Sequence, residues 1–257
     1  MLTLGISPCP NDTFAFHHLI HHVGGFEVTL DDVEALNRGV VEVTKISVAG
    51  FGHIRDRYAM LRAGGAAGFG VGPLLVAARD RPPGGRVAIP GARTTAALLL
   101  RLLGDFRTVE MRFDLIEDAV LRGEVDCGVL IHEGRFTYAD KGLVKLADLG
   151  EVWEREMQAP IPLGAIAIQR SLGPEVARRI DAQIRASVEH AMAHPEESAA
   201  FVREHAQEMD PAVMQSHIDL YVNDYTLDLD EGAVVKLLDF GVAQGLFPPS
   251  DLPIFAY

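Results

Sequence analysis

The chain has 257 residues, of which 48% are hydrophobic and 23% charged, which is enough to bury the core of one domain or of two smaller ones. Its formal net charge of −13 argues against binding to nucleic acid or to an anionic membrane surface, because both repel an acidic protein. We expect no secretory signal and no membrane span. The two cysteines, Cys9 and Cys127, fit neither a disulfide framework nor a zinc pattern, so a cytoplasmic protein is expected.

The pattern predicts a first strand over residues 2–6, then a proline-stiffened turn and a helix. Asn11, Asp12 or Thr13 can cap this helix, which leaves free backbone amides near the end of the strand. Cys9 lies in the same turn, where a thiol near a helix start can act as a nucleophile; the alternative is a small buried residue.

Four histidines in this helix form two pairs with i, i+4 spacing that could hold a metal: His17, His18, His21 and His22. No acidic or thiol ligand accompanies them at a recognisable spacing. We therefore expect packed or solvated histidines and no metal site.

A second strand is predicted over 26–30 and a short helix carrying Asn37 over 32–40. The segment 44–47 is interpreted as a loop before a helix over 48–54. In that loop Lys45 offers a mobile cation and Ser47 a hydroxyl that both donates and accepts hydrogen bonds.

The glycine-rich segment 64–72 superficially suggests a dinucleotide fingerprint. It fails that test because 73–77 continues as a strand where a helix should begin, so we interpret it as flexible backbone. After a crossover at 79–85, a strand is predicted over 86–89 and a helix over 94–103. Thr94 and Thr95 supply capping hydroxyls, and the amides there suit a carboxylate or phosphate.

The segment 125–131 is predicted to be a buried strand that ends at His132, after a strand over 109–113 and a helix over 116–122. Ligands of open α/β sheets lie at the carboxyl ends of strands, and a histidine there can accept a proton near neutral pH. The alternative is that His132 is simply a satisfied polar residue at a strand end.

A return strand is predicted over 161–168, followed by helices over 176–193, 195–205, 211–222 and 231–244. The chain is thus expected to be an α/β protein of two lobes, each a doubly wound mixed sheet flanked by helices, with a ligand cleft between them. The larger lobe comprises 1–85 plus 170–257, and the smaller lobe, 86–169, carries Thr95 and His132.

Six segments in chain order resemble the 1,4-dihydroxy-6-naphthoate synthases of the futalosine route to menaquinone: SPCPNDTF (7–14), TKIS (44–47), GVGPL (70–74), PGARTTA (90–96), IHEGRFTY (131–138) and PLGAI (162–166). The resemblance covers essentially the whole chain. It implies the fold of type II periplasmic-binding proteins and the conversion of cyclic dehypoxanthinylfutalosine to 1,4-dihydroxy-6-naphthoate by a carbon–carbon lyase without metal or cofactor.

The resemblance also implies residue roles, with His132 as the general base. The segments matching the family's substrate-binding positions are Lys45-Ile46-Ser47 and Thr95-Ala96. We add Asn37 and Asp12 as further candidates for binding the substrate, a small carboxylate. The family's usual serine after the His-Glu pair is Gly134 here, which affects the rim of the pocket more than its chemistry.

Two other functions fit the same features. One is the chorismate dehydratase of the same pathway, which has the same scaffold. The other is a non-catalytic protein that binds a small carboxylate, since a fold does not fix a function. The sequence does not determine the oligomeric state.

Overall fold

The chain crosses twice between two compact units. The structure, a computed structural model, describes residues 1–39, 41–206 and 210–257. The first unit comprises residues 1–68 and 162–257, and the second comprises 69–161. The division expected from the sequence placed the boundaries after residues 85 and 169. The crossing strand β6 (Leu74–Ala77) instead pairs with β9 (Cys127–Leu130) and β10 (Val144–Asp148), so it belongs to the second unit.

The first unit is built on a mixed sheet. Its strand order is β2 (Phe26–Leu30), β1 (Leu2–Ile6), β3 (Val43–Ser47), β11 (Ile161–Gln169) and β4 (Tyr58–Met60), with β5 (Ala66–Gly68) paired to β11. β1 is parallel to β2 and β3, whereas β11 is antiparallel to β3 and β4. The expectation of a loop at 44–47 is therefore wrong. This segment lies in β3, which pairs with β1 and β11 and whose five residues are all buried.

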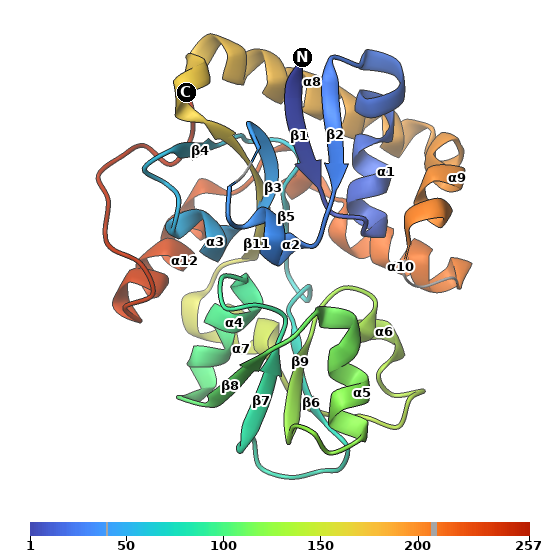
Figure 1. Cartoon of the computed structure of the whole chain (residues 1–257), viewed down its shortest axis with the longest axis vertical. Helices are drawn as coiled ribbons and strands as arrows, with labels where there is room; N and C mark the ends of the chain where they lie inside the picture. The colour runs from blue at the N-terminus through green and yellow to red at the C-terminus, as the bar shows by residue number, and fades with distance from the viewer. Residues whose placement is uncertain (40, 207–209) are drawn as a thin grey trace. The chain divides into compact units, whose positions relative to one another are not determined.

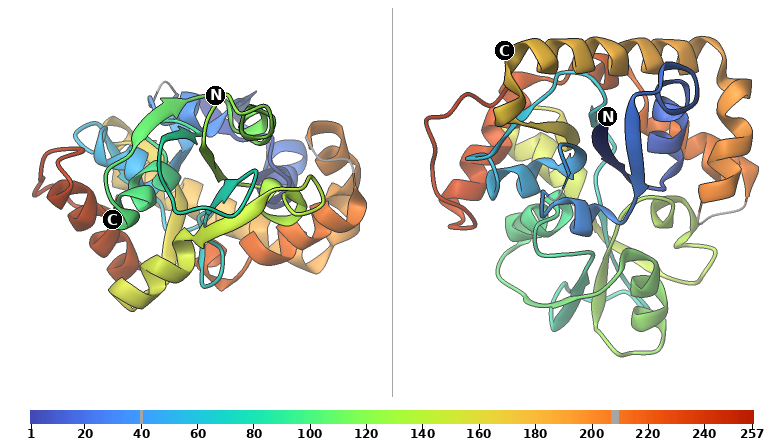
Figure 2. Two further views of the ribbon diagram at one scale, coloured as in Figure 1. Left: turned by 90° about the horizontal axis from the view of Figure 1, so that it is seen from below. Right: turned by 45° about the horizontal axis from the view of Figure 1, so that its top comes forward.

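Helices flank this sheet, and several begin or end within a few residues of the predicted positions. They are α1 (Pro10–His18), α2 (Val33–Leu36), α3 (Val48–Gly52), α8 (Gly173–Ala193), α9 (Pro195–His205), α10 (Pro211–Tyr221), α11 (Asp224–Leu227) and α12 (Glu231–Ala243). Figure 1 shows α1 next to α9, and Figure 2 shows the long α8 leading into α9. The predicted helix over 32–40 ends earlier, at Leu36, and residue 40 lies outside the described residues.

A π-helical turn, Leu19–Val23, continues α1. The hydroxyl of Ser187 on α8 accepts a hydrogen bond from the Leu19 amide at 2.9 Å and donates one to the Ala15 carbonyl at 2.7 Å. Ser187 is fully buried. It therefore satisfies two backbone groups where the α-helical pattern changes. Apolar side chains of β1, β11 and α8, including Ile6, Ile166 and Ile184, form the core beside it.

The second unit has its own mixed sheet, in the order β10, β6, β9, β7 (Arg86–Ile89) and β8 (Arg107–Glu110). β7 is parallel to β8 and β9, and β6 is antiparallel to β9. Its helices are α4 (Thr95–Leu100), α5 (Ile116–Leu121), α6 (Gly134–Thr137) and α7 (Leu149–Met157). The α/β class with two mixed sheets flanked by helices is thus confirmed.

The glycine-rich segment before β6 has a packing role within the second unit. A Cβ atom on Gly72 would lie 2.3 Å from the backbone of Gly150, at the start of α7. Only glycine allows this close approach of two backbones. In the part of the chain that the structure describes, no helix combines the length and apolar character needed to cross a lipid bilayer.

Candidate functional site

His132 follows β9 in the second unit, as predicted. The strand ends at Leu130, and His132 is half-buried two residues later, with φ of 54°. For a residue with a Cβ atom, this left-handed backbone conformation is less stable than the right-handed one by about 1–2 kcal/mol. The turn maintains the conformation through hydrogen bonds to its carbonyls, including one from the Phe136 amide to Glu133 at 2.8 Å. The imidazole packs edge-on against Phe113, with ring centroids 4.8 Å apart.

The start of α4 lies at the same edge of this sheet. β7 and β9 are parallel neighbours, with Ala88 opposite Gly128, so their carboxyl ends point the same way. The chain leaves β7 through a turn to Thr94, whose hydroxyl caps α4 by accepting a hydrogen bond from the Ala97 amide at 3.1 Å. Thr95 and Ala96 follow as buried first residues of the helix. The topology thus brings this helix start and His132 to one sheet edge.

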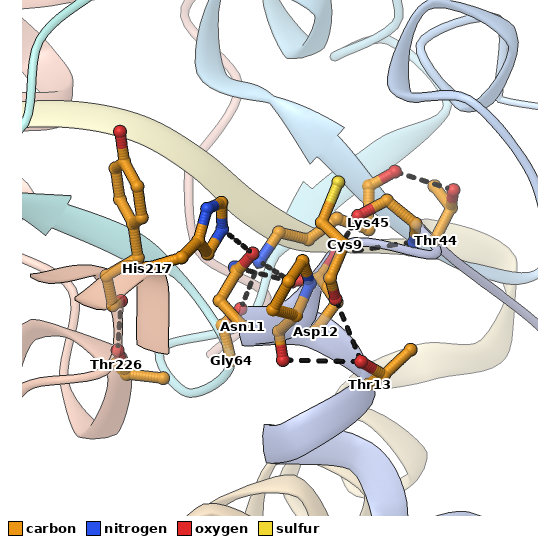
Figure 3. A network of polar contacts seen from close by, with 12 residues as sticks. Cys9, Asn11, Asp12, Thr13, Thr44, Lys45, Gly64, His217 and Thr226 are labelled. Atoms are coloured by element: carbon orange, nitrogen blue, oxygen red, sulfur yellow. Dashed lines mark hydrogen bonds and ion pairs between the residues drawn. The ribbon is translucent and has the colours of Figure 1, made fainter. Parts of the chain in front are cut away.

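Asp12 and Lys45 form a buried ion pair in the first unit (Figure 3). The Lys45 Nζ is 2.7 Å from the Asp12 Oδ1 and donates to the Gly64 carbonyl at 2.9 Å. The Ser7 hydroxyl donates to the other Asp12 oxygen at 2.7 Å. Asp12 is 1% exposed and Lys45 6% exposed. The expectation that Lys45 is a mobile loop cation is therefore wrong, because β3 and its carboxylate partner fix it.

A histidine that was not among the predicted site residues, His217, also belongs to this network. Asn11 donates from its amide to Asp12 at 3.0 Å, and its amide oxygen is 2.9 Å from His217 Nε2. Figure 3 shows His217, Asn11, Asp12 and Lys45 next to one another. His217 lies on α10 with 1% exposure, far along the chain from its partners. No local pattern around it could have predicted the contact.

Asn37 and Ser47 also contact each other in the first unit. The Asn37 amide nitrogen donates to the Ser47 hydroxyl at 3.2 Å, and the Ser47 backbone amide donates to the Asn37 side-chain oxygen at 2.7 Å. Both residues are buried. Ile46 has 0% exposure, so its side chain is part of the interior. Cys9 is buried as well, at the residue before α1.

Two named relatives match the chain over nearly its full length. Both are called 1,4-dihydroxy-6-naphtoate synthase. The relative from Thermus thermophilus is 47% identical over 271 residues, which cover 99% of this chain and 98% of its own. The relative from Streptomyces coelicolor is 46% identical over 267 residues, covering 96% and 95%.

Solved structures support the predicted fold. Protein AF1704 from Archaeoglobus fulgidus is 37% identical with a TM-score of 0.91, covering 96% of this chain and 98% of its own. The periplasmic aliphatic sulphonate binding protein SsuA from Escherichia coli has a TM-score of 0.66 at 14% identity, covering 98% and 90%, which shows the fold alone. The sequence profile of a family described as menaquinone biosynthesis matches residues 2–240. The chain belongs to this menaquinone-biosynthesis family and has a periplasmic-binding-protein-like fold, as the resemblance of its six segments predicted.

Proposed function

We propose that this protein is a cytoplasmic lyase that converts cyclic dehypoxanthinylfutalosine to 1,4-dihydroxy-6-naphthoate on the futalosine route to menaquinone. The observation that carries the proposal is the 46–47% identity, over nearly the whole chain, to two proteins named for that product. The placement of His132 beside a helix start on one sheet edge supports it, because this arrangement combines a base with anion-binding amides.

His132 is the general base of the proposed reaction. Its neutral imidazole removes an acidic proton next to a carbonyl or hydroxyl of the substrate. The electron pair left behind drives cleavage of the carbon–carbon bond to the sugar-derived carbons, the ring opens and these carbons leave as the naphthalene becomes aromatic. Aromaticity supplies much of the driving force, so a positioned base suffices and the proposal requires no metal or cofactor. The left-handed backbone and the Phe113 ring restrict where the imidazole points.

The remaining candidates bind the substrate. The amides of Thr95 and Ala96 donate hydrogen bonds to its carboxylate at the start of α4, where charge-assisted hydrogen bonds are strong. The ammonium group of Lys45 has three N–H donors. Among the described contacts, two of these donors are used by Asp12 and the Gly64 carbonyl. The third donates to the substrate. The side chains of Ser47 and Asn37 supply a hydroxyl and an amide, and Asp12 orients Lys45.

The direct test is to incubate the purified protein with cyclic dehypoxanthinylfutalosine and to analyse the products by mass spectrometry. Many equivalents of 1,4-dihydroxy-6-naphthoate per protein chain support the proposal. Recovery of the substrate unchanged, even when it binds, contradicts it and indicates a binding protein. A parallel incubation with chorismate identifies a dehydratase, in which case the proposal is also wrong.

The role of His132 is tested with His132→Asn. Asparagine tolerates the left-handed backbone but is not a base, so the fold is retained. We expect turnover to fall by roughly 10²–10⁴-fold, the usual contribution of a general base, while substrate affinity changes little. The matched control is His53→Asn, since His53 is exposed at the end of α3 and packs against Phe247. Near-normal turnover in His132→Asn refutes the assignment.

A further inference from the structure

Histidines from two distant parts of the chain gather on the first unit. The four histidines of α1 and its π-helical turn meet two more at the end of α8. We call the following residues the histidine cluster: His17, His18, His21, His22, His190 and His194, with Glu196 and Glu197 of α9. The sequence predicted no metal site because the first four histidines lacked a further ligand nearby. The tertiary structure supplies both imidazoles and carboxylates.

The rings form a continuous group. The centroid of His18 is 3.9 Å from that of His190 and 5.1 Å from that of His22. His190 is 4.7 Å from His194, one helical turn along α8. Two imidazoles on one tetrahedral zinc ion, each at about 2.0–2.1 Å, have centroids about 5 Å apart. The separation of His190 and His194 is therefore close to that of two imidazoles on one ion, whereas His18 and His190 are stacked.

Glu197 is a carboxylate in direct contact with this group. Its Oε2 is 2.8 Å from the His190 Nε2. It also interacts electrostatically with four other imidazoles, those of His17, His18, His22 and His194. A carboxylate among imidazoles provides the mixed nitrogen and oxygen ligands that zinc and similar ions prefer.

A possible set of three ligands already lies close together. One ligand atom each of His194, Glu196 and Glu197 lies within 4.8 Å of the other two. Ligand atoms of a single zinc ion are about 3–4 Å apart. The side chains of all three residues are exposed, so they can change rotamer without displacing the core.

We propose that the histidine cluster binds one divalent transition-metal ion of the zinc class, with His194, Glu196 and Glu197 as its main ligands. His190, whose Nε2 is 2.8 Å from the Glu197 Oε2, completes the coordination. The ion joins the end of α8 to the start of α9, so it stabilises the first unit rather than taking part in the proposed chemistry, which depends on His132 in the second unit. This inference does not rest on the proposed function.

The test uses Zn²⁺ itself as the probe. The protein is stripped of metal with a chelator, dialysed and titrated with zinc chloride by calorimetry, and its thermal unfolding is recorded with and without the ion. We expect one ion per chain bound in the micromolar range or tighter. The melting temperature should rise with zinc concentration, because an ion that binds only the folded state stabilises it.

Two variants locate the site. Glu197→Gln and the double variant His190→Gln/His194→Gln should each weaken zinc binding by about tenfold or more and reduce the zinc-dependent rise in melting temperature. His53→Gln, which removes a histidine outside the cluster, should bind zinc as the unaltered protein does. Glu197 is exposed enough for its variant to fold, and circular dichroism checks this. Absence of zinc binding, or a zinc affinity in the cluster variants that equals that of the unaltered protein, overturns the proposal.

Discussion

Replacing Lys45 by methionine should destabilise the first unit by about 3 kcal/mol. Two unit charges 2.7 Å apart attract each other by roughly 6 kcal/mol at an effective dielectric constant of about 20, and desolvation of the ammonium group offsets much of this. Removing one member of a buried pair typically costs about 3–5 kcal/mol, because the other charge is left without its partner. Ser7 and Asn11 still donate to Asp12, so the lower end of that range applies.

The measurement is urea-induced unfolding of Lys45→Met, Asp12→Asn and the double variant. The double variant should lose less than the sum of the two single variants, by about 2 kcal/mol, because each single change also removes the partner's interaction. Lys145→Met is the matched control: Lys145 is exposed and 4.0 Å from Glu151, so its loss should cost about 0–1 kcal/mol. Additive losses, or a Lys45→Met effect as small as the control, would refute the reasoning.

Three further predictions concern backbone strain, a buried hydroxyl and pH. At His132, with φ of 54°, His132→Asn should change the unfolding free energy by less than about 0.5 kcal/mol and His132→Val should lower it by about 1–2 kcal/mol, because a β-branched residue disfavours this conformation; equal stabilities in urea would contradict this. Ser187→Ala should cost about 1–3 kcal/mol, since it removes the hydroxyl that donates to the Ala15 carbonyl and leaves the Leu19 amide with its bond to the Phe16 carbonyl, and hydrogen exchange at Leu19 should accelerate; an unchanged exchange rate would show that the hydroxyl is dispensable. Burial, followed by neighbouring imidazoles, lowers the pKa of His18, so the unfolded chain takes up more protons than the folded chain as the pH falls through about 6.5. In the presence of a chelator, the melting temperature should therefore fall between about pH 7.5 and pH 5.5, and His18→Gln should reduce that fall; an identical pH dependence in the variant would exclude His18 as a cause.

Local signals in the sequence were sufficient for many elements. The predicted strand at 86–89 and helix at 195–205 coincide with β7 and α9. Glycine and proline flank the strand, and proline begins the helix, so their boundaries are marked by the residues themselves. His132 could be placed at a strand end for the same reason, because a continuous apolar run stops there.

Other features depended on partners that the local pattern does not contain. β5 has only alanine and glycine, and it forms because β11 lies alongside it. The ion pair of Asp12 and Lys45 requires β1 and β3 to be neighbours, which is a property of the strand order. The helix α7 did have a signal that was not recognised: Asp148 caps it, and its apolar Leu149 and Trp153 are four residues apart.

The discontinuous first unit has a consequence for folding during synthesis. β11, which pairs with both β3 and β4, leaves the ribosome only after the whole segment 69–161. That segment is continuous, so its sheet can form earlier, and the Leu149 amide then bonds to the Pro73 carbonyl at 2.9 Å. This contact brings the two ends of the insertion together and lowers the entropy cost of closing the long loop between β3 and β11. The second unit is thus expected to fold before the first.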